Sequence, residues 1–178
     1  MSGASAERDR AGWLPAVATG ATAFDRVLGL RPDLCADYHA FAALFWDDGL
    51  VGPVVLELCR LRIAQLLGCE GELRLRHEPA RAAGLDEAKI ARLDRWPTAP
   101  EFTAVERACL AYAEQFVLDA HAISDAQAAE VASHLTPAGL VALTEALALF
   151  EGFARFRTVM GVAPETLLVG ADGRPVTR

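Results

Sequence analysis

Apolar residues recur at the spacing of an α-helix through most of the chain. Three stripes repeat every three or four residues, which is the pattern of helices that bury one face. They comprise Leu34, Tyr38, Phe41 and Phe45; Leu110, Ala113, Phe116 and Val117; and Leu140, Leu143, Leu147 and Phe150. No segment shows convincing strand alternation, so the sequence predicts an all-α helical bundle. The expected helices cover residues 33–47, 53–67, 72–83, 86–93, 103–119, 124–134 and 137–160.

Several helix starts are marked by side chains that can cap free backbone N–H groups. Capping-box patterns, T-x-x-E and S-x-x-Q, occupy residues 103–106 and 124–127. A Thr-Pro pair at 136–137 offers a cap residue followed by proline at the first helical position. These patterns predict separate helices that end and restart at short turns.

Length and composition indicate one domain. With 178 residues and 53% hydrophobic side chains, the chain can bury one sizeable core, and no shift in composition marks a second one. We expect a flexible N-terminal segment at residues 1–20, a helical domain over 21–162 and an extended or partly ordered tail at 163–178, where Gly and Pro return.

Charge and cysteine usage narrow the class of protein. A net charge of −7 leaves no basic stripe for nucleic acid. The polar N-terminus lacks an apolar signal-peptide core, and Glu145 interrupts the longest apolar run, at residues 140–150, so we expect a cytoplasmic protein without a membrane span. The four cysteines form no C-x-x-C pair, which indicates reduced thiols. No pair of cysteines or histidines has the spacing of zinc ligands, so we expect neither a metal nor another cofactor.

The candidate chemistry gathers in residues 57–84. Glu57 lies in the apolar run VGPVVLELCRL, where a carboxylate must find a partner or shift its pKa. Cys69 follows twelve residues later. Glu72 stands three residues after Cys69, where a dithiol redox protein of this layout would carry its second cysteine. This difference favours acid–base chemistry over thiol redox chemistry.

The chain from Val54 to Leu85 resembles the carboxymuconolactone decarboxylase superfamily, which also contains the alkylhydroperoxidase D-like proteins. The segments FTAVERACLAYAEQF and LVALTEALALFEGFARFRTVMGV extend the resemblance over roughly residues 35–162. It implies a helical bundle of the alkylhydroperoxidase D-like type, in which helices pair between subunits, usually in trimers or hexamers. Independently, the high apolar content also favours a homo-oligomer.

The resemblance is divided between two branches of this superfamily. The hydroperoxidase pattern is a glutamate, eleven residues and then C-x-x-C-x-x-x-H. Glu57 and Cys69 match it, Glu72 replaces the second cysteine and Arg76 occupies the histidine position. The decarboxylase pattern is similar to E-L-R-x-H, which the segment from Glu72 fits better, although His77 falls one residue late.

Three functions remain open, and an enzyme is favoured. The first is lyase- or decarboxylase-like acid–base chemistry on a small anionic organic substrate. In it, Glu57, Glu72 and His77 move protons while Arg60 and Arg76 hold the anion. The sequence identifies no particular substrate.

The two alternatives rest on other features. Cys69 could serve a thiol-dependent alkylhydroperoxidase with peroxiredoxin-like antioxidant activity, although Cys59 would lie about 15 Å along the helix, too far to form a disulfide with it. Because His77 falls one residue after the family's histidine position, a non-catalytic helical oligomer is the third alternative. His121 is a further candidate near the substrate, and an interaction with a helix C-terminal dipole explains it equally well.

These residues lead to a geometric expectation. One cavity should be lined by Glu57, Cys69, Glu72 and either Arg76 or His77. On a regular helix His77 points about 100° away from Arg76, so an inward His77 requires a local irregularity. The proline two residues after His77 is the expected cause.

Overall fold

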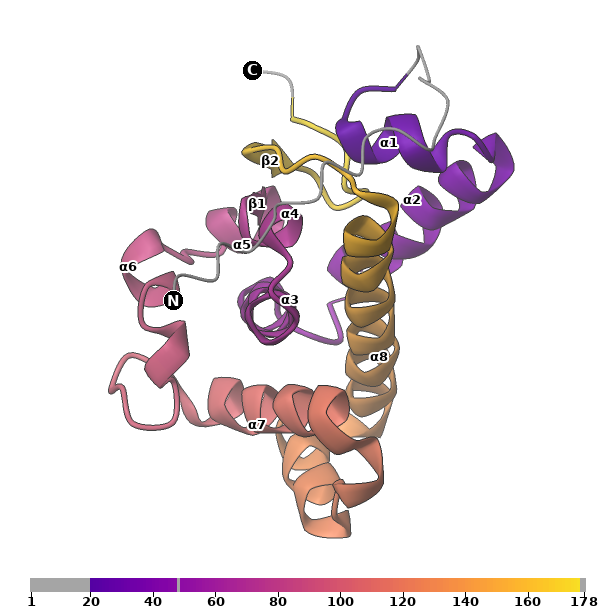
Figure 1. The fold of residues 1–178 in the computed structure, drawn as a ribbon. Helices are drawn as coiled ribbons and strands as arrows, with labels where there is room; N and C mark the ends of the chain where they lie inside the picture. The colour runs from indigo at the N-terminus through magenta and orange to yellow at the C-terminus, as the bar shows by residue number, and fades with distance from the viewer. Residues whose placement is uncertain (1–19, 48, 177–178) are drawn as a thin grey trace, which may run out of the picture.

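The computed structural model describes residues 20–47 and 49–176, and helices dominate this part of the chain (Figure 1). The predicted all-α class is confirmed. The helices are α1 (Ala23–Leu28), α2 (Pro32–Asp47), α3 (Pro53–Leu67), α4 (Glu70–Leu73), α5 (Glu78–Ala82), α6 (Glu87–Ile90), α7 (Ala104–Asp119) and α8 (Asp125–Met160). Two 3₁₀ turns, η1 (Leu93–Arg95) and η2 (Ala120–Ala122), and two strands, β1 (Leu75–His77) and β2 (Leu167–Val169), complete the described elements.

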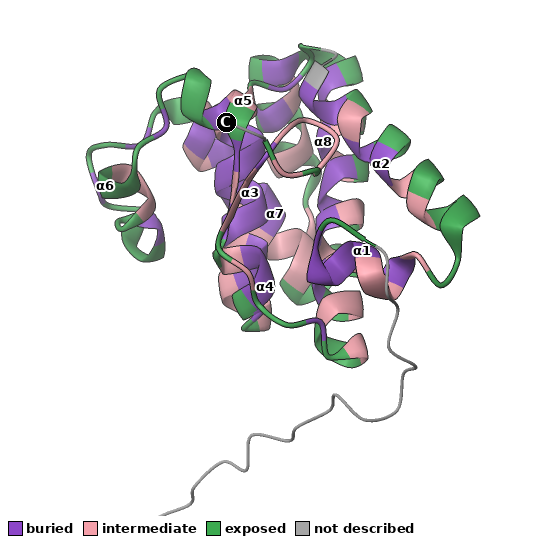
Figure 2. Ribbon diagram, turned by 90° about the horizontal axis from the view of Figure 1, so that it is seen from above, coloured by how far each residue is buried: buried purple, intermediate pink, exposed green. Residues whose placement is uncertain are grey.

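Helix α3 forms the centre of the core. Pro53 lies in its first turn and Gly68 ends it in the left-handed conformation, at φ 62°, as expected for a helix with these boundary residues. It packs against both α7 and α8, and Figure 2 shows it buried along most of its length. Because neighbours cover α3 on several sides, its polar residues Glu57 and Arg60 are buried with its leucines.

The predicted caps of α7 and α8 are confirmed. Thr103 and Ser124 each form a complete capping box. Helix α8 runs on through the predicted break, but Thr136 interrupts it with a φ of 70°, and its hydroxyl accepts a hydrogen bond from the Gly139 N–H at 3.3 Å. The Thr-Pro pair therefore restarts a helix, as its sequence suggests, with a kink in place of a separating turn.

Among the described helices, α8 alone is long and apolar enough to cross a membrane by length and composition. Its residues Val131, Leu143 and Leu147 are buried in the core formed with α3 and α7. A core helix passes the same test, so this property is weak evidence for a membrane span.

The prediction of one helix over residues 72–83 is wrong, and so is the absence of strands. The segment forms α4, then β1, then α5, and β1 pairs in parallel with β2. The register joins Leu75 to Leu167 and His77 to Val169. This pairing lies outside the reach of local sequence patterns, because β2 belongs to the C-terminal tail.

The two ends of the described chain meet beside the C-terminal half of α8 (Figure 1). Phe24 of α1, which the sequence pattern missed, packs its ring against Tyr38, Phe153 and Phe156, with centroids 4.9–5.9 Å apart. The tail expected to be extended contains β2. Of the segment expected to be flexible, residues 1–19 lie outside the described residues.

Candidate functional site

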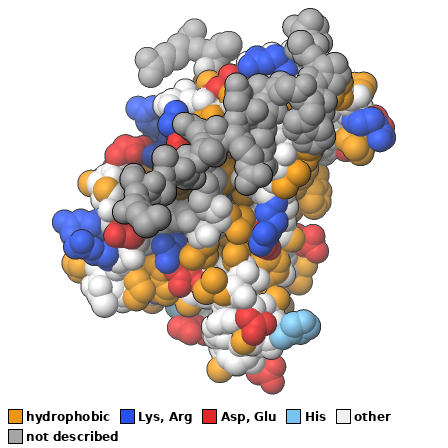
Figure 3. All heavy atoms as spheres, viewed as in Figure 1, with side chains coloured by type: hydrophobic (Ala, Val, Ile, Leu, Met, Phe, Trp, Pro, Cys, Tyr) orange, Lys and Arg blue, Asp and Glu red, His pale blue; other side chains and the backbone are white. Residues whose placement is uncertain are grey.

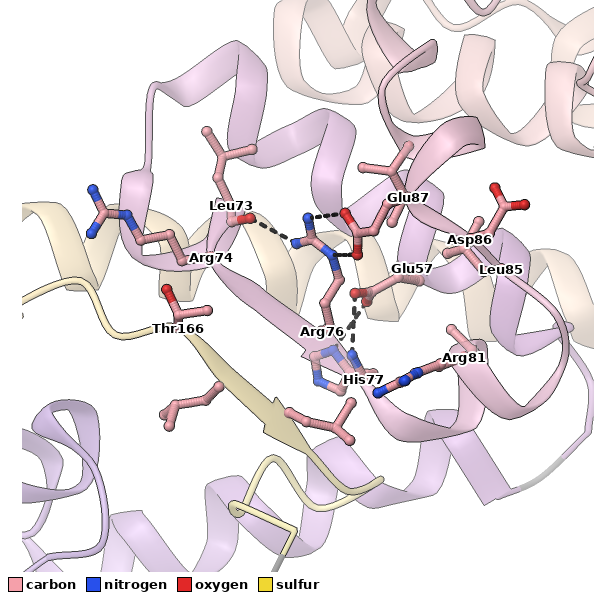
Figure 4. Close-up of a pocket in the computed structure, with 14 residues that line it drawn as sticks. Glu57, Leu73, Arg74, Arg76, His77, Arg81, Leu85, Asp86, Glu87 and Thr166 are labelled. Carbon is pink, nitrogen blue, oxygen red and sulfur yellow. Dashed lines mark hydrogen bonds and ion pairs between the residues drawn. The ribbon is translucent and has the colours of Figure 1, made fainter.

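A cavity of about 720 Å³ lies where β1, α5 and α6 meet β2 (Figure 4). Apolar and charged side chains both line this cavity, which is typical of binding sites for small molecules. Its lining residues are Glu57, Leu73, Arg74, Arg76, His77, Ala80, Arg81, Leu85, Asp86, Glu87, Ile90, Thr166, Leu167 and Leu168.

The Glu57–His77 pair lies on this cavity. The Nδ1 atom of His77 is 3.0 Å from Oε2 of Glu57, and the His77 backbone N–H donates to Oε1 at 3.2 Å. Because an ionised carboxylate only accepts hydrogen bonds, Nδ1 carries a proton. The other ring nitrogen, Nε2, has no hydrogen-bond partner among the described residues, which leaves it available to exchange a proton with a ligand.

Trp46 of α2 fixes the plane of the His77 ring. The two rings stack with centroids 4.2 Å apart and an interplanar angle of 10°. Trp46 is 31 positions away in sequence, and no motif marks it. With Nδ1 held by Glu57 and one face covered by Trp46, the imidazole has one orientation.

Arg60 forms ion pairs with both buried carboxylates of the site, Glu57 and Glu72. Its guanidinium donates to both carboxylate oxygens of Glu57 at 2.8 Å, and it reaches Oε2 of Glu72 at 2.7 Å. It also donates to the backbone carbonyls of Glu72 and Leu75, at 2.8 and 3.0 Å. The side chain is 2% exposed and its donors are engaged. Arg60 therefore ties β1 to α3, which differs from the substrate contact expected from sequence.

A second arginine, Arg157, joins Glu57, Arg60 and Glu72 in one buried ionic cluster. Nε of Arg157, on α8, lies 2.5 Å from Oε1 of Glu72, as an ion pair and without the alignment of a hydrogen bond. The Arg157 guanidinium also lies over the ring of Phe24, 4.1 Å from its centroid. Glu72 thus lies between two cations, one from α3 and one from α8.

Burial and charge act in opposite directions on the two carboxylates. Burial alone raises the pKa of Glu57, but the Arg60 charge, His77 and their hydrogen bonds together hold that pKa well below its usual value. Burial also raises the pKa of Glu72, and Arg157 and Arg60 bring it below its usual value. Both groups are therefore anions at neutral pH, in a cluster with two arginine cations.

The arginines that line the cavity differ in their partners. Arg76 is paired with Glu87, at 2.7 and 2.9 Å, and donates to the carbonyls of Leu73 and Leu75. Arg74 is half-exposed and, in Figure 4, extends away from the labelled cavity residues. Arg81 extends toward His77 in the same view and makes no side-chain hydrogen bond or ion pair with the described residues.

The expected grouping is right in part. Glu57, Arg76 and His77 all line the cavity, so both alternatives at the histidine position are present. Glu72 lines an adjoining pocket of about 30 Å³, which His77 also borders. The expectation is wrong for Cys69, which lines neither this cavity nor the adjoining pocket. Its side chain is buried in the turn before α4.

Two further expectations are corrected by the geometry. The irregularity that brings His77 inward is strand β1, held by β2 and Arg60, and the proline after it lies in the first turn of α5 instead of distorting a longer helix. His121 is exposed in η2, where its backbone N–H donates to Asp119, and it lines neither the cavity nor the adjoining pocket.

Comparisons with known proteins find similar sequences and folds. The family described as "Carboxymuconolactone decarboxylase family" matches residues 35–115, which include the Glu57–His77 pair. The uncharacterised protein YnjA of Escherichia coli (strain K12) is similar to this chain, with 31% identity over 116 residues. The match covers 65% of this chain and 63% of YnjA, so the chain spans less than two thirds of that relative.

Two solved structures share the fold. One is a protein of unknown function from Agrobacterium tumefaciens, whose description relates it to the antioxidant defence protein AhpD; its TM-score is 0.67 at 20% identity, covering 78% of this chain and 95% of that one. The other is a cysteine-to-alanine variant of the debrominase Bmp8 in complex with 2,3,4-tribromopyrrole. Its TM-score is 0.63 at 16% identity, covering 83% of this chain and 76% of that one. At these identities the likeness concerns the fold alone.

Proposed function

Since residues 35–115 match the carboxymuconolactone decarboxylase family, we propose that the chain is an acid–base enzyme acting on a small anionic organic substrate. The observation that carries this proposal is the Glu57–His77 pair on a cavity of about 720 Å³. Glu57 fixes the tautomer of the imidazole, Trp46 fixes its plane, and Nε2 is the atom that transfers the proton. The chemistry we infer is of the lyase or decarboxylase type.

The proposed step uses two side chains of the cavity. Arg81 binds the substrate carboxylate, because it is the cavity cation without an ion pair among the described residues. As the bond between that carboxylate and its carbon breaks, carbon dioxide leaves and the electron pair passes into a conjugated carbonyl group. The His77 imidazolium then donates its Nε2 proton to the carbon, and solvent returns a proton to the neutral ring.

The thiol-dependent alternative has less support. Cys69 is 3% exposed and lies outside the cavity, whereas a peroxidatic thiol must meet its peroxide. No second cysteine stands three residues later. We therefore rank hydroperoxide reduction below acid–base chemistry and make it an outcome of the substrate test.

That test is a screen of the full chain against small carboxylates that bear a conjugated carbonyl or lactone, with release of carbon dioxide as readout. A parallel arm supplies alkyl hydroperoxide with a dithiol reductant. We expect carbon dioxide from at least one carboxylate and negligible peroxide turnover. Peroxide turnover that Cys69→Ala abolishes, with no carboxylate consumed, would establish the thiol reading. Inertness in both arms would favour the non-catalytic oligomer.

Replacing Arg81 with glutamine is expected to weaken substrate binding with little change in kcat. Loss of a charge-assisted contact to a carboxylate corresponds to about 1.5–3 kcal/mol, or a KM increase of roughly 10- to 150-fold. Initial rates on the carboxylate identified by the screen measure this. Arg95→Gln, in a highly exposed side chain outside the cavity, is the matched control and should leave KM unchanged. Equal KM values in both variants would remove Arg81 from the substrate site.

We further propose that the chain forms a homo-oligomer. Helix α2 exposes Leu34, Phe41 and Leu44, whose exposed fractions are 46%, 43% and 59%, and Figure 3 shows further hydrophobic side chains between charged groups on one face. Light scattering on the purified chain should give a mass that is a multiple of 19.0 kDa. Leu44→Glu should lower that mass, whereas Arg95→Glu should not. A monomer at micromolar concentration would contradict the proposal.

A further inference from the structure

A second group of polar side chains lies away from the cavity, where α1 and α2 meet the turn that follows β2. The group consists of Asp25, Cys35 and His39, whose possible ligand atoms all lie within 4.8 Å of one another. The side chains of His39 and Asp25 are only 3% and 10% exposed, and Cys35 is half-buried. The acid–base chemistry proposed above uses none of these residues.

The hydrogen-bond partners of the His39 ring indicate that a positive charge is required between its Nε2 atom and Asp25. Its Nδ1 atom lies 2.5 Å from the backbone carbonyl of Asp172, and its Nε2 atom lies 2.8 Å from Oδ1 of Asp25. A carbonyl oxygen accepts only, so Nδ1 carries a proton. A neutral ring would then turn the Nε2 lone pair toward a carboxylate oxygen, which is repulsive.

A second proton on His39 or a metal cation can relieve this repulsion. Burial raises the pKa of Asp25, but its hydrogen bonds with His39 and Thr22 and the His39 charge bring that pKa below its usual value, so the carboxylate is an anion at neutral pH. The thiol of Cys35 adds a third ligand atom beside this pair. A proton on Nε2 would bridge only His39 and Asp25, whereas a metal cation binds all three side chains.

We propose that Asp25, Cys35 and His39 form a binding site for a divalent transition cation of the Zn²⁺ class. The ligand atoms are Oδ1, Sγ and Nε2, a mixture of oxygen, sulfur and nitrogen that suits Zn²⁺ and is unsuited to Mg²⁺ or Ca²⁺, which take oxygen ligands. The Asp172 carbonyl accepts a hydrogen bond from Nδ1 of His39 and so orients the imidazole with Nε2 toward the cation.

Zn²⁺ binding changes the protonation of this site. Burial and Asp25 raise the pKa of the Cys35 thiol, so the thiol must lose its proton to become a ligand. The 2+ charge of the cation then balances one thiolate and one carboxylate. Arg174, whose charge lowers the pKa of Cys35, favours the thiolate. Binding therefore releases at least one proton.

Calorimetric titration of the full chain tests the proposal. The protein is first treated with a chelator and then titrated with zinc chloride in two buffers that differ in ionisation enthalpy, at about pH 7. We expect one Zn²⁺ per chain and release of at least one proton, from the Cys35 thiol. Absence of stoichiometric binding would leave a hydrogen-bonded His39–Asp25 pair and overturn the proposal. Binding with no release of protons would overturn it too, because the thiol would not then be a ligand.

Matched variants locate the site. Cys35→Ser and His39→Gln should each weaken Zn²⁺ binding by roughly 10- to 100-fold or more, since loss of even an outer-shell partner costs that much. Cys69→Ser and His134→Gln, which change a cysteine and a histidine elsewhere, should bind as the wild type does. Equal affinities for Cys35→Ser and Cys69→Ser would overturn the assignment.

Alkylation of the wild-type chain gives the same answer without a substitution. Zn²⁺ should slow the reaction of Cys35 with iodoacetamide, mapped by mass spectrometry, and leave the rate at Cys69 unchanged. Cys35 is half-buried, so its free thiol can react in the absence of metal. Equal alkylation of Cys35 with and without saturating Zn²⁺ would overturn thiolate ligation.

Discussion

Replacement of Arg60 with methionine is expected to lower the free energy of unfolding by about 3–5 kcal/mol at neutral pH. Methionine fills a similar volume but removes the cation that two buried carboxylates, Glu57 and Glu72, share. It also leaves the carbonyls of Glu72 and Leu75 without their donor. Urea unfolding followed by circular dichroism measures the loss.

The pH dependence separates this effect from a simple packing defect. In the wild type, the pKa values of Glu57 and Glu72 lie below their usual value of 4.5, so their contribution to stability is present above that pH and is lost as the pH falls through the folded-state values. In the variant both carboxylates lose the Arg60 charge, although Glu72 keeps Arg157, and their pKa values rise. The destabilisation should therefore shrink as the pH approaches about 4.5.

Two further variants make the interpretation specific. Arg60→Lys keeps the charge but cannot bridge two carboxylates with a planar fork, so its loss should lie between those of the wild type and Arg60→Met. Arg155→Met removes an exposed pair with Glu151 and should change stability by no more than about 0.5 kcal/mol. A destabilisation by Arg60→Met that matches this control, or that is unchanged at low pH, would contradict the role of the buried cluster.

The same cluster explains which parts of the fold could be predicted from sequence. The bounds of α3 match the prediction because Pro53 and Gly68 mark its ends by local chemistry. The segment after it contains good helix formers, yet it becomes a strand. Its carbonyls bind Arg60 and its backbone pairs with Leu167–Val169, about ninety residues further on. Tertiary contacts of that range override helix propensity and leave no local signature.

The candidate site shows the same division. Glu57 could be singled out because a carboxylate inside an apolar helix requires a partner. His77 is this partner because residues 75–77 form strand β1. A regular helix through the same residues predicts a different direction for the His77 side chain. Trp46, Arg81 and Arg157 join the two pockets from α2, α5 and α8, and nothing in their local sequence indicates this. Cys69 matched a motif, but the turn that carries it points its side chain into the protein interior.

Replacement of His77 with glutamine is expected to lower kcat by about 10²- to 10⁴-fold, the usual contribution of a positioned acid or base. The glutamine amide can still donate a hydrogen bond to Glu57, so the fold and the Arg60 cluster should remain. KM should change little, because binding of the substrate anion is assigned to Arg81. Steady-state kinetics on the carboxylate identified by the screen give both constants.

The pH profile shows whether His77 transfers the proton or merely shapes the cavity. If the imidazolium is the acid, the wild-type pH profile has a limb on which the rate falls as the pH rises, and the glutamine variant has no such limb. His134→Gln, in an exposed histidine outside the cavity, should keep the rate and the profile of the wild type. A His77→Gln variant that keeps the limb at a lower rate would show that another group is the acid. Unchanged kcat would remove the Glu57–His77 pair from the reaction, because the one ring nitrogen free to exchange a proton would be unnecessary.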